Sequence, residues 1–573
     1  MRSRFFCDVD PACPLAEYPR PQLQRGESSW LCLNGPWQYA ITPLSQDTPP
    51  AAWDGIITVP FSPECELSGV MRTVTEKDLL WYRRSITLPE AFAGGRVLIH
   101  FGAVDQIATL YVNGSEAGSH RGGYNAFTFD ITRLLKAGEN ELLLKVWDPL
   151  DKLQYARGKQ CARPRSIWYT AQSGIWQTVW LEAVPQQYIS RLRITPLFDE
   201  AACLVTALSE ADAAVCVTLG TQQFTGRSNE PIRLQLPADF RAWSPEDPYL
   251  YPFSVQLGED SVQSYFGMRK FSCEFDEKGV RRLFLNGKPY FHNGVLDQGY
   301  WPDGLYTAPT DEALIFDIQT MKTMGFNTLR KHIKVESARW YYHCDRLGML
   351  VWQDMPCGGG ETPLLLQKVP VALSRLTLRD SAYRAFARDN AEGRAQYYRA
   401  LREMLEQLYN VTSLAVWVPF NEGWGQFDAA KAHDLVKQLD ATRTVDHASG
   451  WYDQGVGELL SLHIYFKPVT MQRDSKKRAF CVTEFGGLTL GLEGHTFNRK
   501  QWGYFRSADT ATLAQDFRKL YRKQIIPLTK KGLAAAIYTQ LSDVEGEVNG
   551  LITYDREVIK IDPAAVREAI TPQ

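Results

Sequence analysis

Several features that mark secreted, membrane-bound or metal-organised proteins are scarce in this sequence. The 11 cysteines are odd in number, and no two of them form a CxxC pair. This spacing excludes the common zinc motifs and predicts mostly buried thiols in a reducing compartment. The N-terminal segment lacks the uninterrupted apolar core of a signal peptide, and no apolar run is long enough to span a membrane. We therefore expect a cytoplasmic protein without a membrane partner.

The sequence also lacks an excess of charge of one sign. The 63 basic and 65 acidic residues leave a formal net charge of −2, which gives no basis for binding a polyanion such as nucleic acid. The chain contains neither a GxxxxGK[ST] phosphate loop nor an HExxH motif. These absences predict that the protein uses no cofactor and no metal. A metal held by His332, His463 and Asp354 is a minor alternative.

Aromatic residues, in contrast, are abundant. They make up 12% of the chain and include 16 tryptophans. Large β-rich proteins use such residues in sheets and cores, whereas carbohydrate-binding sites stack sugar rings on them. Composition alone favours the first interpretation. The length of 573 residues suggests three or four domains.

The first half of the chain has the pattern of two all-β domains. Residues 1–184 contain short alternating strands separated by turn residues, such as 107–114, which ends in the strong turn signal Asn113-Gly114. This spacing indicates a β-sandwich. Residues 185–273 repeat the character on a smaller scale, which suits an immunoglobulin-like sandwich without the Cys–Trp–Cys pattern.

From residue 274 to 573, apolar strand segments alternate with amphipathic helical segments, which predicts parallel βα units. The helical segments include 311–325, with Thr310 or Asp311 as the N-cap, and 337–348, which ends at Gly348. The predicted strands are 290–298, 328–333, 349–356, 413–422, 444–450, 459–466, 478–486 and 533–541. Eight such strands across about 300 residues predict a (β/α)8 barrel.

Polar side chains gather at the carboxyl ends of these strands. Because barrel active sites lie on that face, we interpret them as a site rather than as incidental exposure. The strand-end residues are Asp297, Arg330, His332, Asp354, Asn421, Glu422, His463, Tyr465, Glu484 and Gln540.

Two of these residues, Glu422 and Glu484, form the pair that glycoside hydrolysis requires. One carboxyl group protonates the departing oxygen, and the other attacks or assists at the anomeric carbon. Asn421, beside Glu422, could bind a sugar 2-hydroxyl, and Gly486 beyond Glu484 allows a close approach. We therefore predict Glu422 as the acid/base and Glu484 as the nucleophile. Sequence spacing leaves open whether the mechanism retains or inverts the anomeric configuration.

Two motifs resemble those of glycoside hydrolase family 2, the family of β-galactosidases, β-glucuronidases and β-mannosidases. They are WVPFNEGWGQ (417–426) and VTEFGG (482–487), and further similar segments such as LNGPWQYA (33–40) and FLNGKPYFHNGV (284–295) extend the resemblance over nearly the whole chain. It implies a jelly-roll, an Ig-like sandwich and a TIM barrel, with a retaining mechanism through a covalent glycosyl-enzyme.

The resemblance also implies roles for other residues. Tyr465 matches a tyrosine placed against the nucleophile, and His463 belongs to the same motif. The remaining candidates for substrate binding or its support are Asp297, Arg330, His332, Asp354, Asn421, Trp424, Trp451 and Tyr538. Trp424 and Trp451 would be sugar platforms, and Tyr538 stands where many relatives have tryptophan.

Departures from the family patterns bear on the substrate, which we expect to be a glycoside or an oligosaccharide. The segment after the first barrel strand, VLDQGYWPDG, lacks the His-Glu pair of large β-galactosidases. Asn549 is followed by glycine and leucine rather than by the lysine that binds a uronate, which disfavours a β-glucuronidase. We expect an exo-acting enzyme of β-galactosidase type, with a β-D-galactofuranosidase or an α-L-arabinosidase as alternatives. A catalytically inactive carbohydrate-binding protein is the alternative from another class, and a homo-oligomer is possible.

Overall fold

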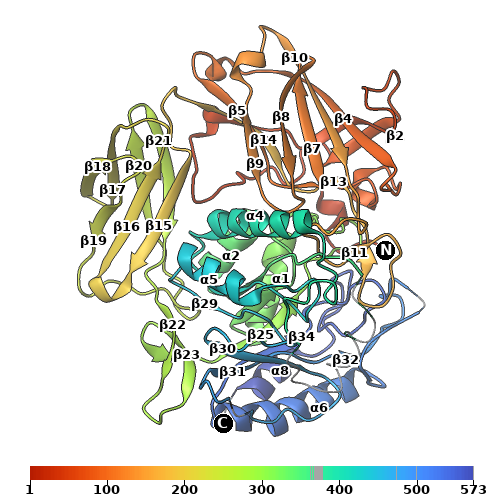
Figure 1. The fold of residues 1–573 in the computed structure, drawn as a ribbon, viewed down its shortest axis with the longest axis vertical. Helices are drawn as coiled ribbons and strands as arrows, with labels where there is room; N and C mark the ends of the chain where they lie inside the picture. The colour runs from red at the N-terminus through yellow and green to blue at the C-terminus, as the bar shows by residue number, and fades with distance from the viewer. Residues whose placement is uncertain (362, 364–365, 367–377, 473, 499, 572–573) are drawn as a thin grey trace.

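The computed structural model describes residues 1–361, 363, 366, 378–472, 474–498 and 500–571. The chain forms a jelly-roll, an Ig-like sandwich and a barrel, and the jelly-roll lies above the barrel in Figure 1 while the sandwich lies at its left. The predicted fold class is confirmed. None of the described helices is both long and apolar enough to cross a membrane.

Two antiparallel sheets form the jelly-roll. The larger has the order β3 (Gly55–Val59), β2 (Gly35–Pro43), β4 (Asp78–Thr87), β10 (Glu139–Trp147), β7 (Ile107–Val112) and β8 (Ser115–Arg121). The smaller has the order β1 (Trp30–Cys32), β14 (Val179–Val184), β5 (Arg96–Phe101) and β9 (Phe127–Asp130). As predicted, Asn113 and Gly114 make the β7–β8 turn, both with positive φ.

The Ig-like sandwich also has two sheets. One contains β15 (Arg191–Leu197), β16 (Ala202–Leu208) and β19 (Ile232–Gln235); the other contains β18 (Gln222–Arg227), β17 (Ala214–Leu219), β20 (Tyr251–Leu257) and β21 (Asp260–Phe266). Arg25 joins this sandwich to the jelly-roll, because its guanidinium lies 2.8 Å from carboxylate oxygens of both Asp260 and Glu182. All three side chains are buried, so the pairs fix the two domains against each other.

The barrel sheet has the order β29, β28, β27, β26, β25, β34, β31 and β30, and all recorded pairs are parallel. The strands are β25 (His292–Asp297), β26 (Thr328–Lys331), β27 (Leu350–Asp354), β28 (Leu414–Val418), β29 (Thr444–Val445), β30 (Leu459–Ile464), β31 (Ala479–Gly486) and β34 (Leu533–Thr539). Every residue in them is buried. Burial of parallel strands on both faces explains why strands such as β28 and β34 are almost entirely apolar.

Helices surround this sheet: α1 (Asp311–Thr323), α2 (Ala338–Leu347), α4 (Ala391–Leu408), α5 (Ala429–Leu439), α6 (Thr510–Leu520) and α8 (Pro563–Ile570). Thr310 caps α1 by accepting a hydrogen bond from the Ala313 amide, and Gly348 ends α2 in the left-handed region. Asp311 is not the cap, because its carboxylate pairs with Arg339 instead.

A small sheet lies at the amino-terminal end of the barrel. Its strands are β22 (Phe271–Phe275), β23 (Arg281–Leu285) and β24 (Lys288–Pro289). Leu283 and Leu285 pack in one cluster with the barrel residues Leu350 and Ala415. The cluster fills that end with apolar side chains, so the polar strand tips are concentrated at the opposite, carboxyl end.

Candidate active site

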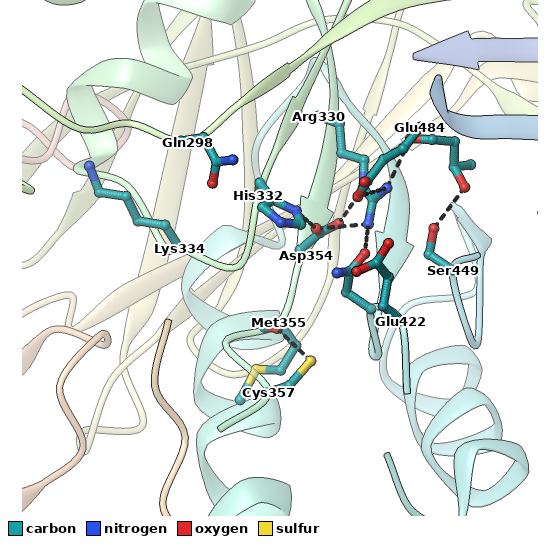
Figure 2. Close-up of polar contacts among 12 residues, drawn as sticks. Gln298, Arg330, His332, Lys334, Asp354, Met355, Cys357, Glu422, Ser449 and Glu484 are labelled. Atoms are coloured by element: carbon teal, nitrogen blue, oxygen red, sulfur yellow. Dashed lines mark hydrogen bonds and ion pairs between the residues drawn. The ribbon is translucent and has the colours of Figure 1, made fainter. Parts of the chain in front are cut away.

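The carboxyl ends of the barrel strands bring most of the predicted site residues into one group. Arg330 comes from β26, Asp354 from β27, and Asn421 and Glu422 follow β28. His463 and Glu484 lie on β30 and β31, and Tyr465 directly follows β30. Figure 2 shows Arg330 at the centre, between Asp354, Glu422 and Glu484.

Arg330 organises this group. Its guanidinium donates to both carboxylate oxygens of Asp354, at 2.9 and 3.0 Å, and to Oδ1 of Asn421 at 2.7 Å. Nη1 lies 3.3 Å from Oε1 of Glu484. Because the planar guanidinium is fully buried and is held by a forked contact to Asp354, it fixes the positions of the Asn421 amide and the Glu484 carboxylate, each of which it meets through a single contact.

Glu484 accepts a second hydrogen bond, of 2.6 Å, from the Tyr465 hydroxyl to Oε2. That hydroxyl also lies 2.9 Å from Oγ1 of Thr539 on β34. Burial raises the pKa of Glu484, and the nearby Glu422 adds to the rise, while Arg330 opposes it. The donors from Arg330 and Tyr465 both stabilise the carboxylate form.

Glu422 lies in the left-handed region, with φ of +52°, and its amide donates to the carbonyl of Ser449 at 2.9 Å. A non-glycine residue in this region carries strain of about 1–3 kcal/mol, which the surrounding contacts must offset. The conformation turns the side chain toward His463, whose Nδ1 is 2.7 Å from Oε1. Burial raises the pKa of Glu422 to about 7, against the opposing charges of Lys159 and Arg330.

His463 lies between the two glutamates. Its Nδ1 is also 3.4 Å from Oε2 of Glu484, and its Nε2 is 3.3 Å from Nη1 of Arg330. Burial lowers the pKa of His463 to about 4, so the ring is neutral near pH 7. Since Arg330 can only donate, Nε2 is the acceptor and the ring proton belongs on Nδ1.

The two carboxylates are close together. One oxygen of Glu422, one oxygen of Glu484 and a ring nitrogen of His463 all lie within 4.8 Å of one another. These atom types could also ligate a metal ion. The Arg330 guanidinium contacts both Glu484 and His463, however, so a cationic group already occupies the position beside them.

His332 binds the far side of this group through Asp354, the partner of Arg330. Nδ1 of His332 lies 2.8 Å from Oδ2 of Asp354, and burial lowers the pKa of the histidine to about 3. Asp297 belongs to a neighbouring buried ion network instead: its Oδ2 lies 2.7 Å from Nζ of Lys331, which also pairs with Glu336. Among the described residues, the Asp297 carboxylate forms no hydrogen bond or ion pair with Glu422 or Glu484.

The structure does not bring Tyr538 to this group. Its ring packs against Phe485 and against Phe517 of α6, at centroid distances of 5.8 and 5.1 Å. Successive side chains of a strand point to opposite faces. The next residue, Thr539, contacts Tyr465, so Tyr538 faces the helices outside the barrel.

The two predicted sugar platforms differ in their surroundings. Trp424 packs 5.1 Å from Trp168 of the jelly-roll, and its indole Nε1 has no partner among the described residues. Trp451 shares a small cluster with Phe386 and Tyr452. Both indoles are 8% exposed, so each has an edge that a ligand can reach.

Sequence reasoning missed several neighbours of the site. Ser449 donates to Oγ1 of Thr483 at 2.9 Å and lies 3.2 Å from Nε2 of His463. Tyr504 stacks on Tyr465 with ring centroids 3.9 Å apart. Lys159 comes from the jelly-roll. Tyr504 and Lys159 lie outside the predicted barrel strands, so the sequence carried no signal for them. Ser449 lies near the carboxyl end of the predicted strand 444–450, and the strand-end rule could have found it.

A cavity of about 930 Å³ adjoins Trp424 between the jelly-roll and the barrel. Glu422 and Glu484 do not line it, although Trp424 is only two residues from Glu422. Its lining includes Arg157, Trp168, Trp424, Trp502 and Glu545. The two glutamates therefore lie beside an aromatic-lined space large enough for a small ligand such as a sugar.

Models of glycosyl hydrolases family 2 match all three parts of the chain. The sugar binding domain matches residues 68–185, the general family model matches 187–269, and the TIM barrel domain matches 278–479. Together these matches cover most of the jelly-roll, the sandwich and the catalytic strands up to β30.

Curated relatives and solved structures agree with these matches. A β-galactosidase of Thermoanaerobacter pseudethanolicus is 27% identical over 48% of this chain and 39% of its own length. A β-glucuronidase of Bacteroides fragilis is 27% identical over 64% of this chain and 54% of its own length, so the chain spans about half the length of these relatives.

Two solved structures share the fold. A β-glucuronidase of an uncultured Clostridium species has a TM-score of 0.73 at 18% identity, over 96% of this chain and 99% of that one. A β-galacturonidase of Eisenbergiella tayi, bound to galacturonate, has a TM-score of 0.71 at 19% identity, over 96% and 99%. With three family models matched in order, the chain belongs to glycoside hydrolase family 2.

Proposed function

We propose that this chain is a retaining glycoside hydrolase, with Glu484 as the nucleophile and Glu422 as the acid/base. The observation that carries the proposal is the separation of the two carboxylates, whose nearest oxygens lie within 4.8 Å. Retaining enzymes hold their carboxyl groups about 5–5.5 Å apart, whereas inverting enzymes hold them about 6.5–9.5 Å apart to admit a water. The distance supports direct attack by Glu484.

In the first step, a carboxylate oxygen of Glu484 bonds to the anomeric carbon while the glycosidic C–O bond breaks. Glu422 gives its proton to the departing oxygen, so the leaving group is released as an alcohol. In the second step, Glu422 takes a proton from a water whose oxygen attacks the anomeric carbon. The glycosyl-enzyme bond breaks, Glu484 is released as a carboxylate, and Glu422 is again protonated.

The surroundings of the glutamates favour these roles. A pKa of about 7 leaves a substantial fraction of Glu422 protonated near neutral pH, as a proton donor requires. Glu484 faces the positive Arg330 and the Tyr465 hydroxyl, which keep a nucleophile charged and oriented. Asn421 accepts from Arg330 through Oδ1, while its Nδ2 has no partner among the described residues and is available to a sugar hydroxyl.

The substrate is proposed within the 1,2-trans glycosides, first an exo-cleaved β-galactoside and then the furanoside and arabinoside alternatives. Relatives are named both β-galactosidase and β-glucuronidase, so their names do not select one sugar. A non-catalytic sugar-binding protein would not need Glu422 and Glu484 placed with an acid/base pKa and an oriented carboxylate. An enzyme explains both features together.

The test is hydrolysis of a panel of nitrophenyl glycosides by the wild type and by Glu484→Gln. The panel holds β-galactopyranoside, β-galactofuranoside, α-L-arabinofuranoside, β-mannoside and β-glucuronide. We expect turnover of at least one sugar, with loss of at least ~10⁴-fold in the variant. Proton NMR should show the first-formed sugar with the β-configuration for the β-glycosides. Inverted product, or full activity in Glu484→Gln, would reject the mechanism.

A further inference from the structure

Lys159 of the jelly-roll reaches the catalytic group from another domain. It precedes β11 (Gln160–Cys161), which pairs in parallel with β12 (Tyr169–Thr170). The residue is only 5% exposed, and its Nζ lies 5.7 Å from the ring centroids of both Trp424 and Tyr169. Trp424 is two residues from Glu422, so Lys159 lies near that glutamate, and its charge opposes the rise in the pKa of both Glu422 and Glu484.

This ammonium group has no oxygen partner in the described part of the chain. Its Nζ makes no hydrogen bond or ion pair there, and the rings of Tyr169 and Trp424 are its neighbours. Glu547, whose carboxylate meets the Tyr169 hydroxyl, is also held by Nδ2 of Asn549. Although the Lys159 side chain is mostly buried, its Nζ is not among the fully buried unpartnered atoms, so it faces space that a ligand oxygen can enter, and an anion there would pair with it.

Other donors around Lys159 also lack acceptors. The indole Nε1 of Trp424 and Nε of Arg157 are both buried and unpartnered among the described residues. Arg157 lies two residues before Lys159, lines the neighbouring cavity, and holds its Cζ 5.9 Å from the Trp168 ring. The segment 157–159 and the Trp168–Trp424 pair therefore bring several unpartnered donors together, while the acceptors Asp151, Glu361 and Glu545 line the adjoining cavity.

We propose, as a refinement that rests on the proposed glycosidase mechanism and replaces its neutral β-galactoside, that Lys159 binds a sugar carboxylate, so that the preferred substrates contain a uronic acid. A carboxylate supplies a negative charge and two acceptor oxygens, which match the Lys159 ammonium and the Trp424 indole N–H. Trp424, which Lys159 faces, is two residues from Glu422, whereas the neighbouring cavity is lined by the carboxylates of Asp151, Glu361 and Glu545, which would repel a uronate. We therefore place the carboxylate on the reacting sugar, with a uronic acid on the leaving-group side as the alternative that the test separates.

Lys159 would also replace the lysine that is missing after Asn549, near the last barrel strand. Asn549 is engaged on both sides, because its Oδ1 accepts from Gln540 and its Nδ2 donates to Glu547. The residues after it are Gly550 and Leu551, so this loop supplies no cation of its own. The jelly-roll supplies one instead through Lys159.

The test compares sugars that differ only by a carboxylate. Nitrophenyl β-galacturonide is paired with β-galactoside, and β-glucuronide with β-glucoside, for the wild type, Lys159→Met and Lys159→Arg. We expect the wild type to favour one uronide over its neutral partner. Lys159→Met should lower that preference by roughly 10- to 100-fold, mainly through KM, and Lys159→Arg should restore most of it. Lys136→Met changes an exposed lysine of the same domain and is the matched control.

Two further arms distinguish the outcomes. The comparison of a galactosyl-glucuronic acid disaccharide with lactose tests for a carboxylate on the leaving-group side. A Lys159-dependent preference confined to this pair would overturn the placement on the reacting sugar. Calorimetry of galacturonate and galactose binding to Glu484→Gln, with and without Lys159→Met, measures recognition without turnover. Uronate binding without hydrolysis by the wild type would reject the proposed function and keep the inference. Preference for neutral sugars, or an equal effect of Lys159→Met on both members of each pair, would overturn the inference.

Discussion

Nδ1 of His463 lies 2.7 Å from Oε1 of Glu422, although the two residues come from different barrel strands. Because the ring is neutral and Nε2 faces Arg330, Nδ1 donates and Oε1 accepts. The acidic proton of Glu422 then belongs on Oε2, the oxygen free to meet a leaving group. The histidine thus orients the proton donor without itself taking part in proton transfer.

The first prediction concerns pH. Glu422 must be protonated for the first step, and burial raises its pKa to about 7. For a substrate with a poor leaving group, kcat/KM should fall about tenfold per pH unit above that value. It should also fall at low pH, as Glu484 is protonated through a pKa above its usual range. A kcat/KM profile that stays flat from pH 6 to 9 would contradict the role of Glu422.

The second prediction separates the two glutamates by leaving group. Glu422→Ala should lower kcat/KM by about 10²–10⁴-fold on alkyl glycosides, because these need protonation of the departing oxygen. Dinitrophenyl glycosides need little protonation and should lose far less in the first step. Added azide, which needs no general base, should restore turnover as a glycosyl azide. Equal losses on both substrate types would exclude Glu422 as the acid.

The third prediction concerns the hydroxyl at the nucleophile. Tyr465→Phe removes a 2.6 Å hydrogen bond to Glu484, so the nucleophile becomes less well oriented and more easily protonated. We expect kcat to fall by roughly 10- to 100-fold and the acid limb of the pH profile to move to higher pH. Tyr538→Phe makes the same chemical change on the outer face of the barrel and is the control. If both variants behave alike, the hydroxyl has no special role.

The fourth prediction concerns Arg330, the buried cation that holds Asp354, Asn421 and Glu484. Arg330→Met leaves two buried carboxylates without their partner, which should cost about 3–5 kcal/mol of stability. Arg330→Lys keeps the charge but loses the forked geometry, so it should fold and yet lose most activity. Thermal denaturation and kcat, measured together, check both variants. A fully active Arg330→Lys would show that positioning by the fork is dispensable.

The fifth prediction links protonation to stability. The folded-state pKa of Glu422 lies above its unfolded value, so folding favours the protonated form, and stability is lost as pH rises through about 7. The cost of ionisation is on the order of 3 kcal/mol at alkaline pH. Glu422→Gln cannot ionise and should gain thermal stability over the wild type at pH 8.5 but not at pH 5. An equal difference at both pH values would contradict the raised pKa.

The sequence by itself determined the architecture and which two glutamates meet at the carboxyl ends of the barrel strands. Continuous apolar strands alternating with amphipathic helices specify a parallel barrel, since such strands are buried on both faces. A barrel in turn brings its strand ends together, so Glu422 and Glu484 could be paired without coordinates. Thr310 and Gly348 show that local capping rules were also sufficient where the backbone alone set the outcome.

Only the tertiary structure decided what surrounds that pair. The face to which Tyr538 points depends on the register of β34, which the apolar sequence LAAAIYT leaves undetermined. Asp297 joined Lys331 rather than the glutamates because the nearest buried cation lay there. Lys159 reached the site from another domain, and no sequence spacing encodes contacts between domains. Local periodicity predicts which segments are strands and which are helices. The charged and hydrogen-bonded partners of each site residue depend instead on long-range packing.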